Sequence, residues 1–119
     1  MDIDLAGRLF NFVVRVIKLL INLPNEPEFN NIRYQLSKSS SSSGANYEVA
    51  QAGYSKADFL FKIDISFREM RESNYWLRLI DATFEFEGIL KVELVDLIKE
   101  SSELKNILGK ISSSTRNNL

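Results

Sequence analysis

The chain of 119 residues contains no cysteine and no histidine. It therefore has no disulfide, no thiol nucleophile and no imidazole for acid–base chemistry. Zinc sites built on these residues are excluded, and so is the Glu-x-x-His di-iron motif of ferritin-like bundles. No pair of carboxylates, lysines or tyrosines is spaced persuasively for catalysis. We expect a protein that is not an enzyme and needs no metal or other cofactor, and the absence of cysteine fits a cytoplasmic location.

A charge excess of either sign is also missing, because 15 Lys and Arg face 16 Asp and Glu. Such a balance gives no general field that would attract nucleic acid or an anionic membrane. Apolar residues make up 45% of the chain, which argues against disorder, and the length predicts a single domain over residues 1–119. Polar residues interrupt the apolar N-terminal run, so it is typical of neither a signal peptide nor a membrane span.

Proline is scarce, and both prolines lie between the first two helical patterns. Pro24 and Pro27 end a predicted first helix over about residues 3–22, because proline lacks a backbone donor and disfavours helix in the residue before it. The loop 24–29 then leads to a second predicted helix over about residues 30–51.

Capping residues mark the other helix ends. Asn30 or Asn31 is placed to cap the second helix, and Gly53 is placed as its C-terminal glycine cap. Ser55, with a carboxylate three residues later, is typical of a helix start. A third helix is therefore predicted over about residues 56–83.

A heptad repeat over about residues 89–111 predicts a fourth helix with one buried face. Its members are Leu90, Leu94, Leu97, Ser101, Leu104, Leu108 and Ile111. We expect this helix on the outside of any assembly, and we expect the polar tail 112–119 to be frayed. No strand-like alternation competes, so the sequence predicts an all-α fold, an antiparallel up-down-up-down four-helix bundle.

The run Ser39–Gly44 has two interpretations. Six serine and glycine residues in a row usually indicate a linker. The helical phase nevertheless passes through the run without a slip, and serine hydroxyls bond to the carbonyl four residues back. On this second interpretation the small side chains lie against a neighbouring helix. Ser39, Ser43 and Asn46 would then form a polar packing layer, with a ligand pocket as the alternative.

The first and third helices carry more apolar surface than one buried face requires. We predict that the surplus forms an interface between copies of the chain. The predicted interface residues are Phe10, Val14, Ile17 and Ile21 on the first helix and Phe61, Ile65, Tyr75, Trp76 and Leu79 on the third. The alternatives are an apolar surface helix without function and a helix lying on a membrane surface. We favour the oligomer and expect no membrane partner.

Charged residues suggest two further sites. Glu48, Glu69 and Glu72 could hold a hard cation, although flanking arginines favour ordinary ion pairs. Basic residues on the first two helices could contact phosphates of a nucleic acid, but five spread charges in a balanced chain favour solvated surface. These residues are Arg8, Arg15, Lys18, Arg33 and Lys38.

Several separated blocks of the chain resemble, in order, the 23S rRNA intervening-sequence family of four-helix-bundle proteins. They are Gln35-Leu36, Ser42, Gly44-Ala45-Asn46, Glu48, Ala50-Gln51, Ser55-Lys56-Ala57-Asp58-Phe59, Lys62 and Arg68-Glu69-x-Arg71-Glu72-x-Asn74-Tyr75-Trp76-Leu77. The resemblance spans nearly the whole chain and is densest from Arg33 to Ile80. It favours the helical interpretation of the serine run, since the family block lies within one helix.

The resemblance implies a left-handed four-helix bundle that assembles as a homopentamer, in bacteria, with no established molecular function. It favours an oligomeric scaffold or adaptor associated with rRNA intervening sequences. A similar pentameric bundle is the accessory subunit of the reverse transcriptase of diversity-generating retroelements, which implies RNA or a nucleic-acid enzyme as an alternative partner. Those accessory proteins tend to be basic and this chain is not. It also has Val49 and Met70 where the family often has Glu and Ala.

Overall fold

Four helices make up most of residues 4–119, the part of the chain that the computed structural model describes, and no strand occurs there. They are α1 (Leu5–Leu20), α2 (Pro27–Gln51), α3 (Lys56–Thr83) and α4 (Gly88–Asn117). The prediction of an all-α chain with four helices is confirmed. None of these helices combines the length and the apolar character needed to cross a membrane.

Side-chain caps begin two of the helices. The Asp4 carboxylate accepts a hydrogen bond from the Gly7 backbone N–H at 2.9 Å, and the Ser55 hydroxyl accepts one from Asp58 N–H at 3.1 Å. Each bond satisfies a donor that the first turn of a helix leaves unpaired. The Ser55 cap explains why α3 begins at the predicted Lys56. The helix also ends at the predicted Thr83. The predicted glycine cap at Gly53 does not form. The C-cap of α2 is Ala52, with φ of −99°, and Gly53 does not take the left-handed conformation of such a cap.

Two predicted boundaries are wrong. Helix α2 begins at Pro27, inside the predicted loop 24–29, because a proline in the first turn lacks only a donor that would be unpaired there anyway. Helix α4 continues through Asn117, so the tail is not frayed from residue 112 as predicted. Tertiary contacts hold its last turns, since Asp64 of α3 accepts hydrogen bonds from Ser112 and from Arg116.

The serine run lies inside α2, so the helical interpretation is confirmed and the linker is excluded. Ser39, Ser40, Ser43 and Gly44 are buried. The Ser39 and Ser73 hydroxyls lie 2.7 Å apart across α2 and α3. One turn further along, Ser43 donates to the Ser66 carbonyl at 2.8 Å, and Ser66 donates to the Ser43 carbonyl at 2.7 Å.

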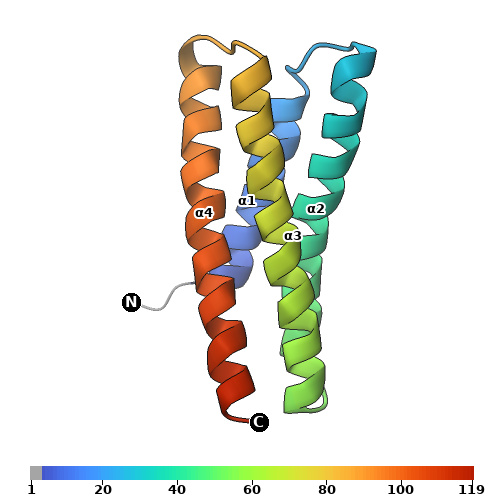
Figure 1. Cartoon of the computed structure of the whole chain (residues 1–119), viewed down its shortest axis with the longest axis vertical. Helices are drawn as coiled ribbons and strands as arrows, with labels where there is room; N and C mark the ends of the chain where they lie inside the picture. Colours follow the sequence, from blue (N-terminus) through green and yellow to red (C-terminus); the bar gives the residue numbers. More distant parts are fainter. Residues whose placement is uncertain (1–3) are drawn as a thin grey trace.

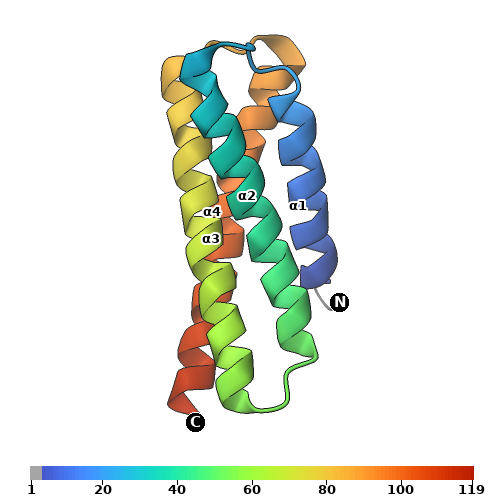
Figure 2. The ribbon, with the colours of Figure 1, turned by 90° about the vertical axis from the view of Figure 1, so that its right-hand side faces the viewer.

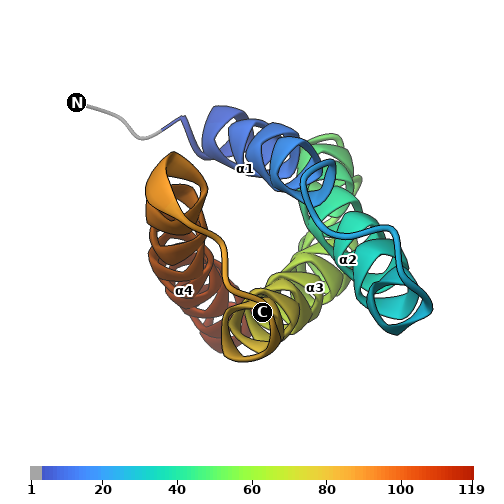
Figure 3. The same cartoon turned by 90° about the horizontal axis from the view of Figure 1, so that it is seen from above.

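Successive helices run in opposite directions (Figure 1). Each helix contacts two neighbours, α1 and α3 each lying against both α2 and α4. No Cα atoms of the described parts of α1 and α3, or of α2 and α4, lie within 8 Å of each other. The four helices therefore surround a common axis (Figure 3). With 16 residues, α1 is the shortest helix and lies alongside only the upper part of α2 (Figure 2).

The core lies between the four helices and consists of apolar side chains from all of them. Its fully buried large members are Phe12, Leu9 and Leu19 of α1, Leu36 of α2, Ile63, Met70, Leu77 and Ile80 of α3, and Leu94, Leu97, Leu104 and Leu108 of α4. At the upper end, the Phe84 ring packs edge-on against both Phe29 and Phe86. Gly88 follows with φ of +59°, a conformation that suits glycine because it has no Cβ.

The connections α1–α2 and α3–α4 lie at the same end of the bundle (Figure 1). Residues 21–28 and 84–88, which form these connections and the helix starts beside them, contain four glutamates and no lysine or arginine. The glutamates are Glu26, Glu28, Glu85 and Glu87, and all four are exposed. The connection α2–α3 and the C-terminus lie at the opposite end.

Candidate functional site

An apolar groove of about 540 Å³ runs along the outside of the bundle between α1 and α2. Four side chains of α1 form one wall, namely Phe10, Val13, Val14 and Ile17. Ser41, Gly44 and Ala45 of α2 form the floor, with Glu48 and Val49 at one end. Phe10 is 61% exposed and Val49 is 54% exposed, so large apolar side chains here meet water in the isolated chain.

Small residues of α2 form the floor of the groove where α1 crosses it. A Cβ atom at Gly44 would lie 3.7 Å from the Leu9 Cβ atom, which is an ordinary van der Waals distance. Leu9 therefore reaches the α2 backbone from the core side, while Phe10 is left on the outer side. The predicted interface residues of α1 lie on this outer wall or its continuation, where Ile21 is 77% exposed.

The predicted interface residues of α3 do not all lie outside. Phe61 and Tyr75 are exposed, and Ile65 is half-buried. Trp76 and Leu79 instead pack against the core of the same chain. These two residues are therefore only partly exposed in the isolated chain, and their place in a contact between copies stays a prediction.

A second exposed apolar surface lies on α4 and was not found from the sequence. Ile89 and Val92 are 83% and 67% exposed, and Val95 lies beside them. We call these three residues the α4 strip. Lys99 borders it, one turn after Val95. The sequence signal for the strip was the spacing of three residues between its members, which places them on one face of the helix. The heptad of apolar residues on the opposite face dominates the pattern of α4.

Ion pairs cover the side of α1 that faces α4. Arg8 contacts Glu100 at 2.7 Å and Glu103 at 3.2 Å. Arg15 contacts Glu93 at 2.9 Å and also pairs with Asp96. The guanidinium groups were predicted to reach phosphates, but four carboxylates of α4 already neutralise them. This arrangement argues against direct nucleic-acid contact by these two arginines.

These contacts shift the protonation equilibria in the expected directions. Hydrogen bonds from Arg15 lower the pKa of the Glu93 carboxyl, and bonds to Glu100 raise the pKa of the Arg8 guanidinium.

The other predicted basic residues are scattered. Arg33 donates to the carbonyls of Leu23 and Pro24 and so ties α2 to the preceding loop. Lys18 and Lys38 are exposed, on α1 and α2 respectively. The structure therefore does not gather the five predicted contacts into one basic surface.

The chain matches the model of the 23S rRNA-intervening sequence protein family over residues 1–110. The chain belongs to this family. It is also similar to a crystal structure of a protein of unknown function from the S23 ribosomal protein family of Bacteroides thetaiotaomicron VPI-5482. The two chains share 29% identity with a TM-score of 0.76, over 91% of this chain and 97% of the other. No curated protein matches the chain.

In this member of the 23S rRNA-intervening sequence protein family, the predicted polar layer is built by serines. Ser39 and Ser43 lie in the contact between α2 and α3, as described above. Asn46 instead donates to the Ser42 carbonyl of its own helix at 2.9 Å, so it does not bond to α3.

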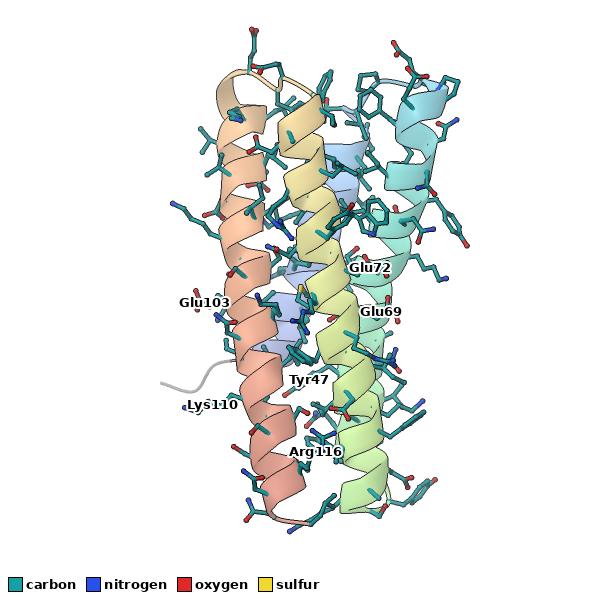
Figure 4. The ribbon with its side chains drawn as sticks, in the orientation of Figure 1. Tyr47, Glu69, Glu72, Glu103, Lys110 and Arg116 are labelled. Carbon is teal, nitrogen blue, oxygen red and sulfur yellow. The ribbon has the colours of Figure 1, made fainter. Side chains whose placement is uncertain are left out.

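The three glutamates considered for a metal do not come together. Glu69 and Glu72 lie on the part of α3 that faces α2 (Figure 4). Glu48 lies at the end of the groove. Within residues 4–119, no three acidic side chains are grouped closely enough to hold a metal ion. Burial and then the neighbouring Glu72 raise the pKa of Glu69.

Proposed function

We propose that the protein is a self-assembling, non-enzymatic scaffold or adaptor associated with rRNA intervening sequences. Its bundle would be the left-handed, up-down-up-down unit of a homopentamer. The observation that carries the proposal is the groove between α1 and α2, which presents large apolar side chains on two rigid helices. Membership of the 23S rRNA-intervening sequence protein family supports the same role.

The exposed apolar surface is large enough to contribute measurably to association. Phe10, Ile17, Ile21 and Val49 are between 44% and 77% exposed. Full burial of one such side chain contributes about 1.5–3 kcal/mol, so covering the exposed half of all four gives about 3–6 kcal/mol. Association costs about 4–15 kcal/mol in lost freedom, so the partner surface must add apolar contacts of its own.

Light scattering coupled to size exclusion tests the proposal. At micromolar concentration we expect a mass that is a multiple of 13.7 kDa, about five times for a pentamer. Ile17→Asp places a charge in the groove and should shift the protein toward monomer. Asn106→Asp, on the polar outer side of α4, is the matched control and should not. A wild-type chain that stays a folded monomer would refute the proposal.

One observation favours a second function, that of a nucleic-acid-binding accessory protein. Phe61, Arg68 and Tyr75 are exposed on α3 at intervals of seven residues, so they share one face. The Lys62 ammonium lies 5.6 Å from the Phe61 ring, and the Arg78 guanidinium lies 5.8 Å from the Tyr75 ring. Aromatic rings interleaved with cations suit base stacking and phosphate contact.

Titration of structured RNA at two salt concentrations tests this second function. We expect binding at low salt that weakens as salt rises, and Arg68→Glu should lower the affinity and the salt slope together. Lys110→Glu, a charge reversal on the far side of α4, is the control. If the affinity for RNA does not depend on salt, or if Arg68→Glu leaves the affinity unchanged, α3 is not the binding face.

A further inference from the structure

We infer that the groove between α1 and α2 receives the α4 strip of a second copy, so that the copies join head to tail in a closed ring. The inference rests on the proposed self-association and adds which two surfaces meet. It is an asymmetric contact, because each copy offers the groove to one neighbour and the strip to the other.

The two surfaces have the shapes that such a contact needs. The groove has a floor of small residues beside one wall of bulkier residues, and the strip is a single row of branched side chains on one helix. Within one chain they cannot meet, because α4 lies on a different side of the bundle from the α1–α2 groove (Figure 3). The groove of one copy is therefore available to the strip of another.

The strip and the groove lie at the same level along the bundle. Two ion pairs show which residues of α1 and α4 lie at the same height. Arg8 pairs with Glu100, and seven residues further along α1 Arg15 pairs with Glu93, which is seven residues earlier on the antiparallel α4. By this register Ile17 is level with Lys91, one residue from Val92. Val14 is likewise level with Leu94, one residue from Val95. One residue along a helix is about 1.5 Å, so Ile17 and Val14 nearly match Val92 and Val95 in height.

Matched levels meet one of the two conditions for a ring. Rotation about an axis parallel to the bundle moves one copy onto the next without changing the height of any residue. A heterologous contact that needs no shift along the axis closes into a ring when its rotation divides a full turn, whereas one that needs a shift continues as a helical filament. Beyond Val95 the outer side of α4 carries polar residues such as Lys99, Asn106 and Lys110, so the apolar match covers the part of the groove from Val14 to Ile17 and stops short of Phe10.

Charge at the edge of the contact is complementary. Glu48 at the end of the groove is exposed, as is Lys99 beside the strip, and neither has an ion-pair partner in the described part of the chain. Leu9 lies against Gly44 and, by the register above, is level with Lys99. Glu48 follows Gly44 by four residues, about one helical turn. A lysine side chain spans that distance.

Cross-linking of single-cysteine variants tests the pairing, and the chain offers no native cysteine to interfere. Ile17→Cys and Val92→Cys are purified separately, mixed under conditions that exchange subunits, and treated with a short bismaleimide. We expect covalent dimers in the mixture and almost none with either variant alone. Val14→Cys with Val95→Cys is a second pair at the next level. Ile17→Cys with Lys110→Cys is the control. Lys110 lies in the lower half of α4 (Figure 4), away from the level of Ile17, so this pair should not cross-link.

The outcomes separate the inference from the proposed function. If light scattering gives an oligomer but neither matched pair cross-links, the pairing is wrong while self-assembly stands. Covalent dimers from Ile17→Cys alone, without enrichment in the mixture, would mean that two α1 helices face each other and would overturn the inference. A monomer in light scattering would remove both.

Charge reversal gives an independent measurement. Lys99→Glu should raise the dissociation constant of the assembly by roughly twofold to fivefold, the range of an exposed ion pair. Glu48→Lys combined with Lys99→Glu should restore it. If the double variant assembles more weakly than both single variants, these two residues do not meet and the register is wrong.

Discussion

The two serine pairs between α2 and α3 should respond differently to substitution by alanine. Ser43 and Ser66 form two hydrogen bonds, each from one hydroxyl to the carbonyl of the other residue, and these bonds use both hydroxyl protons although the two hydroxyl oxygens lie 3.2 Å apart. Ser39 and Ser73 share one bond between their hydroxyls, and Ser73 can also donate to the Glu69 carbonyl of its own helix at 3.0 Å. The first pair should therefore behave additively and the second should not.

The magnitudes follow from the number of bonds lost. A buried intramolecular hydrogen bond contributes about 1 kcal/mol net. Ser43→Ala and Ser66→Ala should each lower the free energy of unfolding by about 1 kcal/mol, and together by about 2 kcal/mol. Ser39→Ala should also remove about 1 kcal/mol. Adding Ser73→Ala then costs little, because the shared bond is already gone, which gives a coupling energy of about 1 kcal/mol.

Urea unfolding at one fixed protein concentration measures these values, since association makes stability depend on concentration. With a slope of about 1.5 kcal/mol per M, a loss of 2 kcal/mol moves the midpoint by about 1.3 M. Thr83→Ala is the control. Its hydroxyl is exposed, lies outside the groove and bonds only within α3, so its effect should stay below about 0.5 kcal/mol.

The coupling energies decide whether this reasoning holds. A coupling above about 1 kcal/mol between Ser43 and Ser66 would mean that their two bonds are not independent. Full additivity between Ser39 and Ser73 would mean that their hydroxyls do not share a bond. Either result would refute the hydrogen-bond pattern described for the contact between α2 and α3.

Three further predictions concern charged groups. Because Arg15 lowers the pKa of Glu93 from its ordinary value of 4.5, the carboxylate stabilises the folded state at neutral pH and loses this effect as pH falls through the lowered pKa. Glu93→Gln should therefore cost up to about 1 kcal/mol at pH 7 and nothing in strong acid, as measured by urea unfolding at a series of pH values. Glu69 has a raised pKa, chiefly from burial, so its charged form destabilises the folded state once the pH has risen through that pKa. The Glu69→Gln variant should therefore unfold at a higher urea concentration than the wild type at pH 7, and at the same concentration in acid. Asp64→Ala removes the partner of Arg116 on α4, so amide hydrogen exchange in the last two turns of α4 should accelerate by roughly fivefold to tenfold, while exchange in the upper half stays unchanged.

The helices were predictable where their signals are local. Ser55 and the carboxylate that follows it mark the start of α3. The unbroken phase through Ser39 and Ser43 allows a helical serine run, and the family resemblance then favours it. The end of α4 was not predictable, because its polar residues have no local preference strong enough to hold a helix. It is held by Asp64, about fifty residues away in the sequence, and such a tertiary partner overrides propensity.

The candidate site was only partly predictable for the same reason. An apolar surplus on α1 is visible in the sequence, and it lies outside the bundle. On α3, however, the sequence does not distinguish a side chain that packs against the core, such as Trp76, from one that is exposed, such as Tyr75. Pairing of Arg8 and Arg15 with α4 spans most of the chain and has no local signal. The α4 strip was overlooked because the buried heptad accounts for most apolar residues of that helix.

The acidic end of the bundle gives any ring of copies two unlike faces. If rotation about an axis along the bundle relates the copies, all of them point the same way, and their exposed glutamates near the α1–α2 and α3–α4 connections gather on one rim. The charge of that rim grows with each copy, whereas the opposite rim carries the α2–α3 connections and the C-termini. Such a particle is electrically polarised along its axis. A polyanion would be repelled from one rim, so it would have to approach from the other rim or from the side.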